Sequence, residues 1–379
     1  MKKLLHRYFH SRFYEILTAT FQPLLPLVLL GTYAQALLVA AFSRNGFFTE
    51  VFGIKSWLPG YALIRQGLSM LTAYTLGLLG LLTAIFAARA VARRNPTLAM
   101  LVAGVGFLVL NTTRLAMLGP GLGLGGLLMG LVFGLLVGWL LNLARPRLTA
   151  SLIIIFAVAI RLGLNALAVG EISPSFTGIP HGGVGVLLAV IANSVLAWFG
   201  LTPLIDPLSP LLTGPTATAN LTAVLAHKTV PYLTTIGTLY RPFALFGGVG
   251  GTLGLIIAIL LADRRRTQRQ LAKWSLVPGL VNLNLPLLVG YPLLLNPLML
   301  IPFTLAPLAA TALAWVALHL HLMTAAVYHV PATTPGPMLA WLATNGNWPA
   351  LIVAVIGLAA SVAIYWPFVK MLEEVAPDV

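Results

Sequence analysis

The sequence predicts an all-α integral membrane protein, for three reasons. Of the 379 residues, 59% are hydrophobic and only 8% are charged, and the mean hydropathy is +0.96. Soluble domains carry roughly 25% charged residues, so a soluble fold is excluded. Long apolar runs recur along the whole chain with short basic segments between them, as in a protein that crosses the lipid bilayer several times.

The first fifteen residues are basic, aromatic and amphipathic. No small-residue cleavage site follows them, so a helix on the membrane surface is favoured over a cleaved signal. Thr202–His227 is rich in proline and threonine and is predicted as a re-entrant hairpin. We expect about ten spans, and the apolar segments that predict them are Pro23–Phe42, Gly67–Ala88, Thr97–Leu110, Gly121–Leu143, Thr149–Val169, Val184–Phe199, Phe243–Ala262, Leu298–Leu320 and Leu351–Phe368.

Basic residues gather on one predicted side of the membrane. The N-terminal segment, residues 89–94, 145–147 and 263–273, and Lys370 together hold 15 of the 22 lysines and arginines. Because Lys and Arg accumulate in cytoplasmic loops, these segments and both termini are predicted to be cytoplasmic. Basic clusters beside apolar spans also account for the net charge of +14 without a nucleic-acid partner.

Few side chains could support catalysis or bind a metal. The chain has no cysteine, which removes disulfides, thiolate metal sites and cysteine nucleophiles. His319 and His321 are two residues apart and would point away from each other on a helix. Glu171 and Asp206 each fall at a predicted membrane boundary, and no nucleophile-elbow motif occurs. We therefore predict no catalytic residue, no metal and no cofactor.

Two further features lie within predicted spans. The glycine-rich run at residues 119–126 has a spacing seen in dinucleotide-binding loops, but no strand precedes it, so close helix packing is the better interpretation. Arg161 and Asn165 are unusual at membrane depth and require partners inside the protein.

Residues 277–307 cannot form one continuous helix. Proline and asparagine interrupt the apolar run at Pro278, Asn282, Asn284, Pro286, Pro292, Asn296, Pro297, Pro302 and Pro307. Broken backbone at membrane depth is tolerated only where it is buried in protein or lines a polar cavity. The stretch is therefore predicted to be the wall of a substrate site.

This stretch resembles the signature of enzyme IIC, the membrane component of the bacterial sugar phosphotransferase system, in its lactose/cellobiose/diacetylchitobiose family. The family pattern N-I-N-E-P and then G-x-P-x-x-x-N-P stands here as N-L-N-L-P (282–286) and G-Y-P-L-L-L-N-P (290–297). Further collinear resemblances are N-G-F-F (45–48), G-G-V-G-G-T-L-G-L (247–255), V-P-A-T-T-P-G-P (330–337), T-N-G-N-W (344–348) and Y-W-P-F (365–368).

The resemblance implies a sugar permease for a β-linked disaccharide in the bacterial cytoplasmic membrane, acting as a homodimer with cytoplasmic IIB and IIA partners. It implies two re-entrant hairpins, a dimer-contact half at residues 1–150 and a sugar-pocket half at 151–379. The phosphocysteine of a IIB domain is lacking, so we expect the phosphoryl donor to be a separate protein. The family-matched candidates for sugar binding are Asn282, Asn284, Leu285, Asn296, Thr333, Thr334, Thr202 and Tyr232.

Three of these positions depart from the family pattern. Leu285 replaces the acid of N-I-N-E-P, and Thr202 and Tyr232 stand where the family has histidine. One alternative is therefore a transport-silent sensory module that acts on a fused or partner signalling domain. For the Asn and Thr candidates, the alternative to sugar binding is that they cap broken helices.

The absence of natural cysteine makes the predicted topology testable. Single cysteines introduced by Arg94→Cys and Arg266→Cys should react with a membrane-impermeant thiol reagent only from the cytoplasmic side, because both positions lie in predicted cytoplasmic segments. Lys55→Cys, in the predicted external loop, is the control and should react only from outside. Labelling of all three from one side would contradict this topology.

Overall fold

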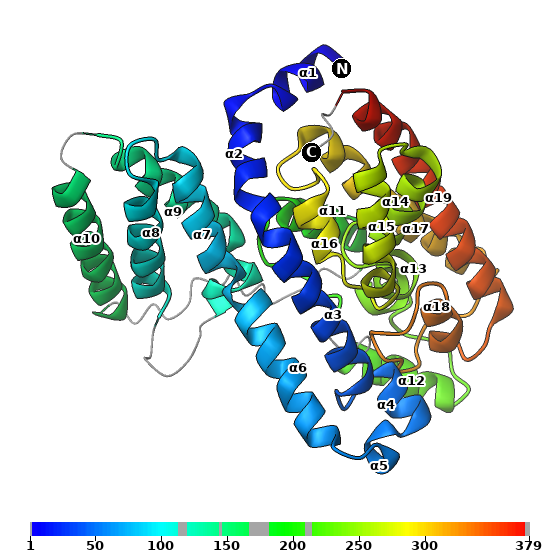
Figure 1. The fold of residues 1–379 in the computed structure, drawn as a ribbon. Coiled ribbons are helices and arrows are strands. Elements are labelled where there is room, and N and C mark those ends of the chain that lie inside the picture. The colour runs from blue at the N-terminus through cyan, green and yellow to red at the C-terminus, as the bar shows by residue number, and fades with distance from the viewer. Residues whose placement is uncertain (1, 113–119, 144–145, 167–181, 209–213, 376–379) are drawn as a thin grey trace. The chain divides into compact units, whose positions relative to one another are not determined.

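A computed structural model describes residues 2–112, 120–143, 146–166, 182–208 and 214–375. All regular secondary structure in these ranges is helical (Figure 1). Five helical stretches are long and apolar enough to cross a membrane: Arg12–Ala41, Tyr61–Val91, Pro146–Ala166, Pro297–His319 and Trp348–Val375. The predicted all-α, multi-pass membrane fold is thus confirmed, whereas the total number of spans stays a prediction.

The chain divides into two compact units. Unit 1 comprises Met1–Gly31, Met70–Ser175 and Phe199–Thr202, and unit 2 comprises Thr32–Ser69, Phe176–Trp198 and Pro203–Val379. The boundaries fall within two helices, α3 (Leu25–Ala41) and α6 (Tyr61–Thr75).

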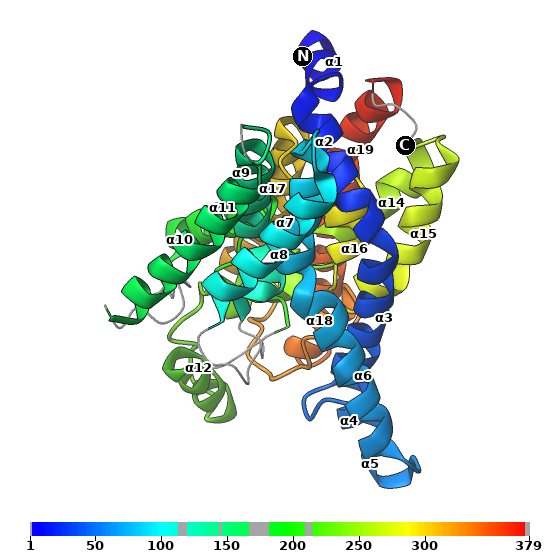
Figure 2. The same ribbon diagram turned by 60° about the vertical axis from the view of Figure 1, so that its left-hand side comes forward.

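The helices of unit 1 are seen from a second direction, after a turn of 60° about the vertical axis, in Figure 2. Besides the first part of α3 and the last part of α6, its elements are α1 (Lys2–Phe9), α2 (Arg12–Phe21), η1 (Gln22–Leu24), η2 (Leu76–Leu78), α7 (Leu79–Val91), α8 (Pro96–Asn111), η3 (Pro120–Leu122), η4 (Leu124–Gly126), α9 (Leu127–Leu140) and α10 (Pro146–Ala166).

Helices α7 and α9 approach so closely that their backbones touch. A methyl group at Gly130 would collide with the carbonyl of Gly80, and one at Gly134 with the carbonyl of Ala84. Small residues four apart on both helices make this approach possible, because residues at that spacing share one face. The glycine-rich run also lies against α7, because a Cβ added at Gly80 would be 2.8 Å from the carbonyl oxygen of Gly123 and 3.0 Å from the carbonyl of Gly126. Close packing was predicted for this glycine-rich run, and the described part of it confirms the prediction.

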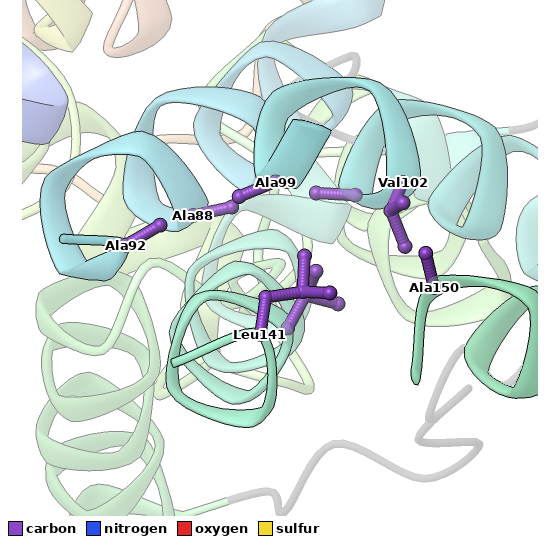
Figure 3. Packing of buried hydrophobic residues seen from close by; sticks show 8 residues of the cluster. Ala88, Ala92, Ala99, Val102, Leu141 and Ala150 are labelled. Carbon is purple, nitrogen blue, oxygen red and sulfur yellow. The ribbon is translucent and has the colours of Figure 1, made fainter. Parts of the chain in front are cut away.

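Alanines extend this contact to four helices (Figure 3). A buried cluster brings together Ala88 of α7, Ala99 of α8, Val137 of α9 and Ala150 of α10. Arg161, also on α10, is buried, and its guanidinium lies 3.5 Å from the carbonyl oxygen of Leu110 near the C-terminal end of α8. A helix C-terminus favours a cation, so this carbonyl is one partner that the intramembrane arginine requires.

Unit 2 holds the remaining helices. With the last part of α3 and the first part of α6, its elements are α4 (Phe47–Phe52), α5 (Ile54–Trp57), α11 (Gly183–Trp198), α12 (Pro215–Leu225), the π-helical turn η5 (Ile236–Tyr240), α13 (Arg241–Ala244), α14 (Thr252–Ala262), α15 (Arg266–Leu280), α16 (Leu285–Gly290), α17 (Pro297–His319), α18 (Met338–Ala343) and α19 (Trp348–Val375).

In unit 2, the structure corrects the prediction for residues 243–262 and confirms the predicted breaks in residues 277–307. Phe243–Ala262 was expected as one span, but the structure interrupts it between α13 and α14, where glycines with positive φ turn the chain. Residues 277–307 are broken, as predicted, into the end of α15, the short α16 and the start of α17. Pro302 and Pro307 nevertheless lie inside α17, so only some of the prolines mark the breaks. Part of the predicted hairpin Thr202–His227 lies outside the described residues.

The close contact between α7 and α9 predicts that replacing glycine by alanine lowers stability at Gly134, inside the contact, but not at Gly163, outside it. Gly134→Ala should lower the melting temperature in detergent, because its methyl group would meet the α7 backbone and force the helices apart, at a cost of about 1–3 kcal/mol. Gly163→Ala, on α10 with nothing within 4 Å of the added carbon, should leave stability unchanged or raise it by up to about 1 kcal/mol. Equal melting temperatures for the two variants would contradict the close packing.

Candidate functional site

The candidate site begins at a glycine loop between α13 and α14. Four glycines of residues 245–251 have φ in the left-handed region, which side chains with a Cβ rarely adopt: Gly247, Gly248, Gly250 and Gly251. Gly250 also leaves no space for a Cβ, because that atom would overlap the ring of Phe303 on α17. The loop can therefore turn sharply inside the apolar part of unit 2.

Side chains from separate segments donate hydrogen bonds to the carbonyl groups of this loop. Because lipid offers no hydrogen bonds, such carbonyls need partners within the protein. The donors are Thr252 Oγ1 to Gly247 O (2.5 Å), Asn284 Nδ2 to Val249 O (2.8 Å), Tyr365 OH to Gly250 O (2.7 Å) and Ser361 Oγ to Gly251 O (3.2 Å).

Asn282 joins this loop to two other segments. Its φ of 66° is in the left-handed region, which asparagine tolerates better than most residues. Its Oδ1 accepts a hydrogen bond from the N–H of Gly247 (3.1 Å), and its Nδ2 donates to the carbonyls of Ala332 (2.7 Å) and Thr334 (3.4 Å). The side chain is buried. Asn282 therefore holds three chain segments together.

The other two predicted asparagines are also bonded to backbone. Asn284 donates to the glycine loop, as described above. Asn296 is fully buried; its Oδ1 accepts from the N–H of Leu298 at the start of α17 (3.0 Å), and its Nδ2 donates to the carbonyl of Pro292 (2.7 Å). Asn296 thus caps the start of α17, whereas the side chain of Asn284, at the N-cap position of α16, makes no cap hydrogen bond to that helix.

The remaining predicted site residues differ in their exposure. Leu285 is buried at the start of α16. Thr333 is buried and accepts a hydrogen bond from the N–H of Phe47 (3.0 Å), whereas Tyr232 is 44% exposed. Thr334 is also buried, and its hydroxyl has no partner among the described residues. Thr202 is exposed and is grouped with unit 1, whereas the other seven belong to unit 2.

A pocket of about 430 Å³ opens on unit 2 beside these segments. Its apolar lining comes from Val39, Leu208, Pro331 and Ala332. Its polar lining comes from Ser43, Arg44, Asn45, Arg65, His329 and Thr333. Ligand pockets of several hundred Å³ with a few polar groups are typical of sites for small molecules.

The wall of the pocket is connected to the family-matched stretch. Ala332 in that wall accepts the hydrogen bond from Asn282. Leu208, also in the wall, packs on a buried cluster formed by Ala36 and Ala40 of α3 with Val281 and Leu283. A movement of the segment at 281–284 would therefore shift the pocket wall at Ala332 and Leu208.

The pocket contains polar residues that the sequence-based prediction missed. Among the predicted site residues only Thr333 lines it, while Asn45, Arg65 and His329 were not predicted. A signal existed for Asn45, because it opens the N-G-F-F resemblance at residues 45–48. The lining residues supply hydrogen-bond donors and acceptors that can bind hydroxyl groups.

Comparisons with known proteins identify the family. The family model "Phosphotransferase system, EIIC" matches residues 18–307. The "PTS system cellobiose-specific EIIC component" of Lactococcus lactis subsp. lactis (strain IL1403) is 41% identical over 139 residues, which are 36% of this chain and 28% of that protein. The "PTS system galactose-specific EIIC component" of Lactococcus lactis subsp. cremoris (strain MG1363) is 32% identical over 195 residues, 49% of this chain and 42% of that protein.

A solved structure gives a further match. The transporter ChbC, the IIC component of the N,N'-diacetylchitobiose-specific phosphotransferase system, is matched with a TM-score of 0.43 at 19% identity, over 96% of this chain and 94% of that one. The matched segments span less than half the length of the first curated relatives. Because the family model covers most of this chain, the protein belongs to the EIIC family of the phosphotransferase system.

Proposed function

We propose that this chain is the sugar permease component of a phosphoenolpyruvate-dependent phosphotransferase system and that its substrate is a β-linked disaccharide. The pocket of unit 2 carries this proposal. Its volume suits a small glycoside, and its wall is hydrogen bonded through Ala332 to the family-matched residue Asn282. The names of the relatives, which include cellobiose-specific and oligo-beta-mannoside-specific components, support a β-glycoside.

Hydrogen bonds from the pocket would hold the sugar. Asn45 has an exposed amide that makes no hydrogen bond to any described residue, so it can both donate to and accept from hydroxyls. Ser43 donates to the carbonyl of Val39 (2.8 Å), which leaves its oxygen free to accept. Leu285 supplies no carboxylate, so these neutral groups would replace the acid of the family motif.

Phosphoryl transfer would depend on partner proteins. The chain would present the bound sugar to a cytoplasmic IIB protein, which IIA would phosphorylate in turn; one relative combines C and B components in a single name, "PTS system lactose-specific EIICB component". The cytoplasmic termini, the bacterial inner membrane and a homodimer formed through residues 1–150, with residues 151–379 moving with the sugar, belong to the same proposal. The sensory alternative has no supporting observation beyond the replaced residues.

One prediction of this proposal concerns Asn45, an uncharged side chain that we expect to contact the sugar. Asn45→Ala should weaken the binding of cellobiose or diacetylchitobiose to the purified protein roughly tenfold, because one amide worth about 1–1.5 kcal/mol is removed. Isothermal titration calorimetry measures the change. The control is Gln270→Ala, which removes an exposed amide of α15 outside the pocket lining. If no β-linked disaccharide binds the folded wild-type protein, the proposed function is wrong.

The second prediction separates a structural asparagine from a sugar-binding one. Asn282→Asp keeps the acceptor for the Gly247 N–H but places an oxygen against the Ala332 carbonyl, so we expect a loss of about 1–3 kcal/mol in stability. The melting temperature in detergent should fall, while Asn45→Ala, which removes no protein hydrogen bond, should leave it unchanged. An Asn282→Asp protein with normal stability and no sugar binding would instead place Asn282 in the sugar site.

A further inference from the structure

The pocket of unit 2 is lined by an unusual set of charges. Arg44 and Arg65 come from different segments, the first from the loop after α3 and the second from α6, and His329 comes from the loop after α17. No aspartate or glutamate is among the residues that line the pocket. The wall is therefore positively charged without a compensating acid.

The two arginines also lack partners elsewhere in the part of the chain that the structure describes. Neither arginine makes a hydrogen bond or an ion pair there. By contrast, Arg264 pairs with Glu373 of α19 and Arg265 with the neighbouring Asp263. Two arginines that converge on one pocket without an acid are available to a ligand.

The chemistry of arginine limits what that ligand is. A guanidinium presents several N–H donors in a planar fork that matches the oxygens of a carboxylate or a phosphate. Uncharged hydroxyls are bound equally well by the neutral Asn45 and Ser43, so they do not require two arginines. The segment that Asn282 ties to this wall adds no negative charge either, since position 285 is leucine.

We propose that the pocket binds a β-glycoside that carries a negative charge, with Arg44 and Arg65 holding the anionic group and Asn45 and Thr333 facing the hydroxyls. The anion is a carboxylate or a phosphate attached to the sugar. This inference rests on the proposed function and narrows its substrate class from β-linked disaccharides in general to acidic ones.

Calorimetry with a matched pair of sugars tests the inference. Cellobiouronic acid differs from cellobiose in carrying a carboxylate in place of one hydroxymethyl group, and both are titrated into the full chain in phosphatidylcholine nanodiscs. We expect the acid to bind roughly tenfold more tightly at low ionic strength. The difference should shrink as salt is added, because the arginines are exposed and their charge is screened.

Two arginine variants and a control localise the effect. Arg44→Ala and Arg65→Ala should each reduce the affinity for cellobiouronic acid roughly tenfold more than they reduce the affinity for cellobiose. Arg266→Ala removes an exposed arginine of α15 outside the pocket and should change neither. Equal loss of both sugars in the pocket variants would show that the arginines do not recognise charge and would overturn the inference.

The remaining outcomes separate this inference from the function on which it rests. If both sugars bind the wild-type protein with equal affinity, the charged substrate is wrong and the β-disaccharide permease stands. If neither binds, the proposed function fails and the inference falls with it. If the preference for the acid is lost in nanodiscs that contain phosphatidylglycerol, a lipid headgroup occupies the arginines, and the assignment to a sugar is overturned.

Discussion

Unit 2 depends on one constraint: backbone that is not helical must find its hydrogen bonds inside the protein wherever it lies among apolar segments. The chain meets this constraint with side chains rather than with regular secondary structure. Carbonyls of the glycine loop accept from Thr252, Asn284, Tyr365 and Ser361, and Asn282 serves both a donor and acceptors of other segments. Each unpaired group would otherwise cost about 1–3 kcal/mol, so the asparagines of the family motif are needed for folding before any ligand is considered.

Composition and periodicity predicted the fold class, because long apolar runs have few alternatives to membrane helices. They failed where a run of apolar residues contains a break that hydropathy does not detect. Residues 243–262 remain apolar through the glycine loop, so they were predicted as one span. The reverse error is visible in α17, where Pro302 and Pro307 are accommodated within the helix. Neighbouring groups decide whether a proline ends a helix in a membrane, and a single sequence does not reveal those neighbours.

Prediction of the site was limited in the same way, because a single sequence does not reveal which groups lie next to one another. The motif at 282–297 directed attention to a segment that contributes no residue to the lining of the pocket, and the backbone partners of Asn282 and Asn296 became visible only in the structure. The pocket itself is assembled from residues far apart in the chain, such as Asn45 and Thr333. A hydrogen bond from the N–H of Phe47 to Thr333, 286 positions away, joins their two segments. In the sequence, Arg44 stands in a short loop and nothing marks it as a binding residue. In the structure it lines the pocket, where no lining residue is an aspartate or a glutamate.

The way in which the glycine loop is held has a mechanical consequence for unit 2. Its hydrogen-bonding partners come from the start of α14, from the segment before α16 and from two turns of α19. None of these segments can be displaced alone without leaving a carbonyl unpaired. A change of conformation within unit 2 is therefore expected to carry the loop, α16 and this part of α19 together as one rigid body. The flexible segments must lie outside that body.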